Sequence, residues 1–341
     1  MRYLIGLLAA LALVAPGSSA ALQAGPNDLY VRVVDVGPGL CVITKAPPGM
    51  FFIYDAGHWV GKRCIEAVRD IVTGDRIELL VLSHSDADHL GDAVEILEGH
   101  FVPIILRAGD VRTTSTTWQK TNDAIAAEVR EGATVINFRS LVFTSGLRLD
   151  VGEAAVVVVG GFADWTAPGP TESERRNAVS IVVRLEYNGR SVLLTGDTVG
   201  RRLNDPDSAC KDAEKVMVDN HQAGRVSLKA DVIVAPHHGA NNGSSRCFIQ
   251  AVDPRFVIFS AGHAHQHPTE AAAERYLAHG VPVANIFRTD RGDDEPGPFE
   301  WKVGSISGCR DPRGDDDVED RDSAGRHGGG GVPAGGQRML L

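Results

Sequence analysis

The chain has 341 residues, of which 43% are hydrophobic and 23% are charged. This composition is typical of a globular protein that is large enough to bury a sizeable core. Its formal net charge of -10 argues against a protein that holds nucleic acid by a broad cationic surface, because Lys and Arg contacts to phosphates dominate such binding. An anionic substrate would have to be held locally, and a pair of metal ions could do so.

The first residues have the features of a secretory signal peptide. Arg2 gives a basic start, the stretch from Leu4 to Ala15 is mostly apolar, and small residues follow up to Ala20. The apolar stretch is shorter than the roughly 20 residues of a membrane-spanning helix, so an uncleaved anchor is the weaker alternative. We expect residues 1–20 to be a cleaved signal and the mature chain to be secreted or periplasmic, with no membrane span.

Five cysteines, at positions 41, 64, 210, 247 and 309, allow up to two disulfides in an exported chain. No two of them form a C-x-x-C pair, and their scatter argues against a zinc cluster built from thiolates. The connectivity stays open, and buried cysteines with a single bridge are the simpler alternative.

Short β-rich runs alternate with helical stretches between the two ends of the chain. We expect strands over 29–36, 40–45, 50–57, 77–84, 178–187, 190–197, 230–238, 255–263 and 283–290, and helices over 62–72, 91–100 and 269–280. Asn188-Gly189 stands between two strand runs and is the strongest two-residue hairpin signal. This alternation predicts an α/β chain (α+β layered), with sheets stacked in layers and helices outside them.

The last 32 residues, 310–341, have a run of acidic residues, a glycine tract and almost no apolar periodicity. Such a segment cannot bury enough apolar surface to offset its chain entropy, so we expect a disordered acidic and Gly-rich tail. The organisation that follows is a signal peptide over 1–20, one folded domain over 21–309 and a tail over 310–341.

Ionisable residues recur where apolar strands end. They are Asp55, His84, Asp197, His237 and His263. Loops at the ends of strands are where α/β proteins build their sites, so we expect some of these side chains to meet.

The segment 83–91, "SHSDADHLG", holds four potential metal ligands. His84 and Asp86 are two apart in an extended stretch and can face one metal, whereas Asp88 and His89 diverge and can serve a second position about 3.5 to 4 Å away. Asp197 could bridge the two positions, and His237 could complete the second one. A helix cap with exposed neighbours is the alternative, but no cap needs four such groups. Mixed carboxylates and imidazoles favour Zn²⁺ or Mn²⁺, as one or two ions.

Six segments in order resemble the metallo-β-lactamase fold hydrolases, and within them the C-terminal hydrolase domain of the ComEC-type DNA-uptake competence protein. They are "VVDVGPGLCVI", "IYDAG", "LSHSDADHLGD", "NAVSIVVRLEYNGRSVLLTGD", "APHHGANNGSS" and "SAGHAHQHPT", followed by "FRTDRGD". The resemblance runs from about residue 29 to 303. It implies a four-layer αββα sandwich with metal ions in a groove at the sheet edges.

The resemblance also implies a set of metal ligands: His84, Asp86, Asp88, His89, Asp197 and His237. The chain departs from the wider family at two places. Asp86 stands where most members have histidine, and the only histidine between His89 and Asp197 is His100, which more simply ends a helix. We therefore leave open whether one ion or two are bound.

Further roles follow from the resemblance and from general chemistry. Asp88 would orient a metal-bound hydroxide, and His267 would protonate the leaving oxygen, because imidazole titrates near neutral pH. Asn177 resembles a family asparagine beside the groove. His238 and Ser244 belong to a polar loop whose donors could hold phosphate oxygens.

These residues predict an exported metal-dependent hydrolase. The leading hypothesis is phosphodiester hydrolysis by a metal-activated water, on a small molecule such as a nucleotide or on single-stranded nucleic acid. The resemblance supports this because the ComEC-type domain is thought to degrade DNA. The alternatives are an ester, thioester or lactam hydrolase of the same fold, and a non-catalytic metal-binding module with an incomplete first metal site.

Overall fold

The computed structural model describes residues 28–108, 112–138, 146–162, 171–262, 265, 267–290, 318–323 and 337–340. The expected signal peptide, His263 and Cys309 lie outside these residues. No helix within them is long and apolar enough to cross a membrane.

One mixed sheet has the strand order β15-β14-β1-β2-β3-β4-β5-β6. Its strands are β1 (Asp28–Val33), β2 (Val42–Ala46), β3 (Met50–Tyr54), β4 (Leu79–Leu82), β5 (Ile104–Arg107), β6 (Thr134–Asn137), β14 (Val318–Ser323) and β15 (Gln337–Leu340). Strands β3 to β6 run parallel to one another, whereas β1, β2 and β3 pair antiparallel.

A second sheet has the order β13-β12-β11-β10-β9-β8-β7. Its strands are β7 (Arg148–Val151), β8 (Ala154–Gly160), β9 (Val182–Tyr187), β10 (Arg190–Leu194), β11 (Val232–Val234), β12 (Phe256–Phe259) and β13 (Ile286–Arg288). The expected hairpin joins β9 to β10, and Asn188 and Gly189 have φ of 46° and 76°. Two positive φ values match the twist of a two-residue hairpin, which explains the Asn-Gly pair.

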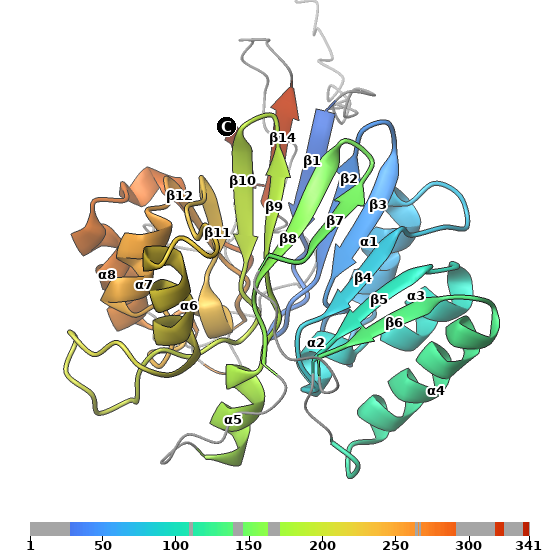
Figure 1. Ribbon diagram of the computed structural model, residues 1–341, viewed down its shortest axis with the longest axis horizontal. Coiled ribbons are helices and arrows are strands. Elements are labelled where there is room, and N and C mark those ends of the chain that lie inside the picture. Colours follow the sequence, from blue (N-terminus) through green and yellow to red (C-terminus); the bar gives the residue numbers. More distant parts are fainter. Residues whose placement is uncertain are drawn as a thin grey trace, which may run out of the picture.

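Helices cover the outer face of each sheet (Figure 1). Beside the first sheet lie α1 (Arg63–Ile71), α3 (Ala93–Gly99) and α4 (Thr116–Arg130), and beside the second lie α6 (Asp212–Gln222), α7 (Arg246–Val252) and α8 (Glu270–His279). Their ends follow local sequence: the side chain of Thr269 accepts a hydrogen bond from Ala272 N at the start of α8, and Gly280 ends it at φ 106°. Two short helices, α2 (Ala87–Leu90) and α5 (Glu172–Ala178), lie at the lower edge of the sheets in this view.

Three buried apolar clusters fill the spaces between these layers. One joins the facing sides of the two sheets, and includes Phe52, Val183 and Leu194. Another packs the first sheet on its helices, and a third packs the second sheet on α6 to α8. The four-layer αββα sandwich implied by the sequence is therefore confirmed.

The acidic tail contains structure that its composition did not predict. Strand β14 pairs antiparallel with β1 along its whole length, from Asp28 opposite Ser323 to Val33 opposite Val318, and β15 pairs with β14. The expectation of disorder is therefore wrong for these residues. Backbone hydrogen bonds to the open edge of β1 do not require apolar side chains, so a segment with little apolar periodicity can still extend a sheet. The other residues of the tail lie outside the described part of the chain.

Two disulfides are present. Cys41, just before β2, bonds to Cys64 in α1, and Cys210, just before α6, bonds to Cys247 in α7. The number of disulfides equals the upper limit expected from the sequence. Which cysteines pair could not be predicted from their spacing.

Candidate metal centre

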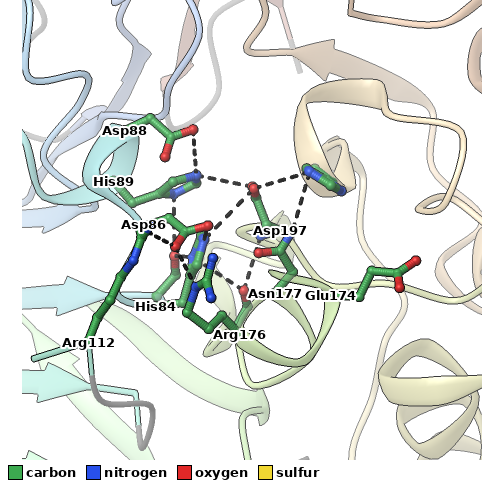
Figure 2. Close-up of polar contacts among 12 residues, drawn as sticks. His84, Asp86, Asp88, His89, Arg112, Glu174, Arg176, Asn177 and Asp197 are labelled. Atoms are coloured by element: carbon green, nitrogen blue, oxygen red, sulfur yellow. Dashed lines mark hydrogen bonds and ion pairs between the residues drawn. The ribbon is translucent and has the colours of Figure 1, made fainter. Parts of the chain in front are cut away.

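The site lies at one edge of the sandwich, where β3, β4, β10 and β11 end. Asp55 follows β3, His84 follows β4, Asp197 follows β10, and His237 and His238 form a turn after β11. Helix α2 begins three residues beyond His84 and carries Asp88 and His89. The two sheets thus contribute side chains from opposite sides to the same place (Figure 2).

Four of these residues form a compact group of potential ligands. Their ligand atoms all lie within 4.8 Å of one another, and the residues are Asp88, His89, Asp197 and His238. Oδ1 of Asp197 is 3.1 Å from Nε2 of His89 and 3.3 Å from Nε2 of His238. Oδ2 of Asp88 is 3.6 Å from the same atom of His238. Two imidazoles and two carboxylates that converge in this way suit zinc or manganese.

The other oxygen of Asp197 faces a second, looser group. Oδ2 is 3.8 Å from Nε2 of His84 and 3.6 Å from Nε2 of His237. Oδ2 of Asp86 is 3.9 Å from Nε2 of His84. Asp197 therefore has one oxygen towards each group, which is the arrangement of a bridging carboxylate.

Two buried atoms support a cation in this centre. Nε2 of His84 and Oδ1 of Asp197 are buried and have no hydrogen-bond partner among the described residues. Oδ1 of Asp197 lies close to the imidazoles of His89 and His238, but not in hydrogen-bonding geometry. Buried polar atoms without partners are costly, and a cation in each of the two groups would satisfy them. The residues present therefore fit a metal ion.

Partners on the far side of the histidine rings fix their orientation. Nδ1 of His89 is 2.7 Å from Oδ2 of Asp55, which also accepts a hydrogen bond from the Ser83 hydroxyl at 2.7 Å. Ser83 N donates to Oδ1 of Asp55 at 2.6 Å. With Nδ1 held by a carboxylate, Nε2 of His89 points into the centre, as in carboxylate–histidine–metal arrangements.

The two histidines after β11 are held in the same manner. Nδ1 of His238 donates to the carbonyl of Ser260 at 2.8 Å, and Nδ1 of His237 to Oδ1 of Asn242 at 2.8 Å. Both histidines have positive φ, 51° for His237 and 55° for His238. This left-handed turn is what directs adjacent side chains to different groups of the centre.

The charges in the centre stabilise one another. Burial favours the neutral form of Asp197, but the imidazoles of His89 and His238 outweigh burial and hold the pKa of Asp197 well below its usual range. Burial likewise disfavours protonated His89, yet Asp197 and Asp55 raise its pKa well above the ordinary value. The pKa of Asp88 is lowered in the same way, against burial, by His89 and His238. Without a metal, the carboxylates hold protons on imidazoles, and a bound cation would replace those protons.

The structure brings together most of the residues singled out in the sequence and places two of them differently from the expectation. His238, expected to contact substrate, joins Asp88 and His89, whereas His237, expected in that position, lies beside His84. Asn177 is at the centre, with Nδ2 3.3 Å from Nε2 of His237. Asp86 is near His84, but its Oδ1 accepts hydrogen bonds from Arg112 and Arg176, both at 2.8 Å.

Two expected contributors differ from their assigned roles. Ser244 is fully buried, and its hydroxyl pairs with that of Tyr276 at 3.0 Å, so its side chain supports the loop instead of lining the groove. His267 is close to the centre, with ring centroids 5.8 Å from His237 and 6.4 Å from His238. Burial and these neighbouring rings lower the pKa of His267 to about 3, so it is neutral at pH 7.

Several residues of the centre were not assigned by sequence reasoning. Asp55 was noticed only as an ionisable residue at a strand end, and that position was the available signal for its role. Asn242 lies in the segment "APHHGANNGSS", five residues after its partner His237, but was given no role of its own. Arg112 and Arg176 had no distinguishing pattern, because their contacts with Asp86 join segments far apart in the chain.

A buried set of imidazoles and carboxylates at the strand ends of an αββα sandwich is the arrangement expected of a metal-dependent hydrolase. Residues 34–263 match the family described as "Metallo-beta-lactamase superfamily", which is more than half of the chain, and the chain belongs to this superfamily.

The chain is similar to two curated relatives. The chain is 27% identical over 267 residues to competence protein ComA of Neisseria gonorrhoeae, in an alignment that covers 77% of this chain and 31% of the relative. It is 25% identical over 297 residues to ComE operon protein 3 of Bacillus subtilis (strain 168), covering 81% and 34%. The chain thus spans about a third of the length of these relatives. Among solved structures, it resembles Igni18, a metallo hydrolase from Ignicoccus hospitalis, at 13% identity and a TM-score of 0.43, over 81% of this chain and 100% of that chain.

Proposed function

We propose that this chain is an exported metal-dependent phosphodiesterase that acts on nucleotides or single-stranded nucleic acid. The observation that carries the proposal is the bridging position of Asp197, with Oδ1 towards His89 and His238 and Oδ2 towards His84 and His237. Two adjacent cation positions suit phosphoryl transfer, in which charge develops on both the attacking and the leaving oxygen. The similarity to competence protein ComA, together with the resemblance of the sequence to the hydrolase domain of a DNA-uptake protein, supports a nucleic-acid substrate.

The residues would divide the work as follows. Asp88, His89, Asp197 and His238 would hold one ion, and His84, Asp86 and His237 would hold another together with Asp197. A bound zinc or manganese would supply hydroxide near neutral pH by lowering the pKa of a coordinated water, to about 7 for zinc. Asp88 would also orient that nucleophile. Asn177 would donate an amide hydrogen bond to the substrate.

His267 would act differently from the role expected of it. A histidine whose pKa is about 3 carries no imidazolium proton at pH 7. Its neutral ring can still donate an N–H hydrogen bond to the leaving oxygen, which stabilises developing negative charge without transferring a proton.

Export is supported by the two disulfides. Cys41–Cys64 and Cys210–Cys247 suit an oxidising compartment, because structural disulfides are rare in the cytosol. The basic and apolar character of residues 1–20 is in keeping with this location.

The test is a comparison of substrates on the purified chain without residues 1–20, loaded with zinc or manganese. We expect turnover of bis(p-nitrophenyl) phosphate, loss of that turnover on chelation, and recovery when metal is returned. The Asp197→Ala variant should be inactive. Turnover confined to a p-nitrophenyl ester, a thioester or a chromogenic lactam would contradict the proposal. Full metal occupancy with no turnover of any of these would favour a non-catalytic metal-binding module.

A further inference from the structure

Two arginines converge on one oxygen of Asp86 beside the metal centre. Nη1 of Arg112 and Nε of Arg176 each donate to Oδ1 of Asp86 at 2.8 Å. Arg112 comes from the segment before α4 and Arg176 from α5, so distant parts of the chain place them together (Figure 2). The second oxygen of Asp86 faces His84, at 3.9 Å from its Nε2. The arginine pair therefore adjoins the looser half of the metal centre.

Arg112 and Arg176 together carry more positive charge than Asp86 neutralises and more N–H donors than Asp86 accepts. Two guanidinium groups face one carboxylate, and each gives it a single N–H, although one arginine can hold a carboxylate by two parallel hydrogen bonds. Arg176 also reaches Glu172 at 3.3 Å, but that carboxylate is 85% exposed and contributes little. Within the described residues, the Arg112 guanidinium makes no other hydrogen bond. Neutralising Asp86 would require only one of the two arginines.

The arginines are also accessible to a ligand. The Arg112 side chain is 33% exposed and that of Arg176 is 16% exposed, so both border solvent while standing against the buried centre. The centre itself contains Asp55, Asp88 and Asp197, in a chain of net charge -10. An anionic substrate that approaches these carboxylates needs positive charge close by, and the planar fork of arginine matches phosphate oxygens well.

We propose that Arg112 and Arg176 form an anion subsite that binds a second phosphate group of the substrate, next to the phosphodiester at the metal centre. This inference rests on the proposed function and adds a preference for substrates with at least two phosphates. The second phosphate is either the next diester along a single strand or a terminal phosphate of a nucleotide.

The test compares substrates that differ by one phosphate. Thymidine 5′-(p-nitrophenyl phosphate) is paired with its 3′-phosphorylated form, and thymidine 3′-(p-nitrophenyl phosphate) with its 5′-phosphorylated form, which covers both strand polarities. For the metal-loaded chain, we expect kcat/KM to be about tenfold or more higher for the bisphosphate of one pair, as charge-assisted hydrogen bonds of this kind provide. In the Arg112→Gln/Arg176→Gln double variant, the ratio should fall to about one.

The ratio of kcat/KM between the two members of a pair distinguishes a loss of phosphate binding by the arginines from a disturbance of the metal centre. A disturbed Asp86 would lower kcat/KM for both members of a pair and leave the ratio unchanged. Arg175→Gln is the matched control, because Arg175 is the exposed neighbour of Arg176 on α5 and should keep the wild-type ratio. Equal kcat/KM within both pairs for the unmodified chain, or a ratio that persists in the double variant, would overturn the inference.

Two further experiments show whether the second phosphate is a diester or a terminal phosphate, and test this inference independently of the proposed function. If methyl esterification of the additional phosphate preserves the advantage, the subsite takes a strand diester, and if it abolishes the advantage, the subsite takes a terminal phosphate. Calorimetry with thymidine 3′,5′-bisphosphate and the two thymidine monophosphates needs no turnover. A chain that cleaves no phosphodiester but binds the bisphosphate more tightly through the two arginines would refute the proposed function alone.

Discussion

Oδ2 of Asp55 lies 2.7 Å from Nδ1 of His89, and both side chains are fully buried. This contact fixes the ring so that Nε2 faces Asp197 and His238. Asp55 is not among the proposed ligands, so its effect on the centre passes through His89 and through Ser83, whose hydroxyl is 3.0 Å from Nδ1 of His84.

Asp55→Ala should therefore weaken metal binding about 10- to 100-fold, which is the usual cost of losing such a partner. Competition with a chromogenic chelator measures the dissociation constant. Asp55→Asn keeps an oxygen that can accept from His89 and should lose less. Asp150→Ala, at an exposed carboxylate on β7, is the control and should bind metal as the unmodified chain does. Equal affinity in all of these variants would refute the role of Asp55.

Gly91 ends the short helix that carries Asp88 and His89, and its place allows no side chain. A Cβ built there would lie 2.3 Å from the carbonyl carbon of His58 and 2.5 Å from Trp59 N, which are backbone atoms that cannot rotate away. Gly91→Ala should push this helix from its position, destabilise the fold by about 1 to 3 kcal/mol and weaken metal binding.

Gly99→Ala is the matched control for that substitution. Gly99 is the last residue of α3, and a Cβ there would meet nothing within 4 Å. Urea unfolding together with the chelator competition should show a loss for Gly91→Ala and none for Gly99→Ala. An unchanged unfolding free energy in Gly91→Ala would contradict the close approach of the backbone of residues 58 and 59 to Gly91.

Glu214 is a buried carboxyl group that supports the loop after His238. It accepts hydrogen bonds from Ser244 N at 2.7 Å, from Ser245 N at 2.8 Å and from the Ser245 hydroxyl. Burial raises the pKa of Glu214 to about 7, against the effect of these donors. A carboxyl whose pKa is higher in the folded than in the unfolded state stabilises the fold below the unfolded value, near 4.5, and that stabilisation is lost as pH rises to about 7.

The free energy of unfolding should accordingly depend on pH through this residue. The free energy of unfolding of the unmodified chain minus that of Glu214→Gln should be about 2 kcal/mol higher at pH 5 than at pH 8. The reason is that the carboxyl group loses its stabilising contribution over that range, whereas the amide does not titrate. Urea unfolding at both pH values measures it. A difference that stays constant or grows towards pH 8 would show that Glu214 is ionised in the fold throughout.

The sequence predicted the layers and much of the centre because both follow local patterns. Each of the strands that precede Asp55, His84 and Asp197 can be recognised from its own sequence, and a sandwich brings the ends of such strands together. The spacing within residues 84–89 predicted His84 and Asp86 on one side and Asp88 and His89 on the other, and His84 and His89 lie near different oxygens of Asp197.

What the sequence did not reveal depends on backbone turns and distant contacts. Adjacent histidines at 237 and 238 are equivalent in a pattern, and only a turn with two positive φ values decides which of them joins Asp88. Ser244 resembled a phosphate donor by composition, but its own positive φ of 57° accompanies a side chain directed at Tyr276. Strand β14 was missed because hydrophobic pattern reports side-chain burial and not backbone pairing.

We propose that Asp88, His89, Asp197 and His238 together hold a cation. Anomalous diffraction from crystals of the chain soaked in manganese or zinc locates such an ion. We expect a strong peak about 2.0 to 2.2 Å from Nε2 of His89, Nε2 of His238 and Oδ1 of Asp197. Crystals with bound metal elsewhere and no peak among these atoms would contradict it.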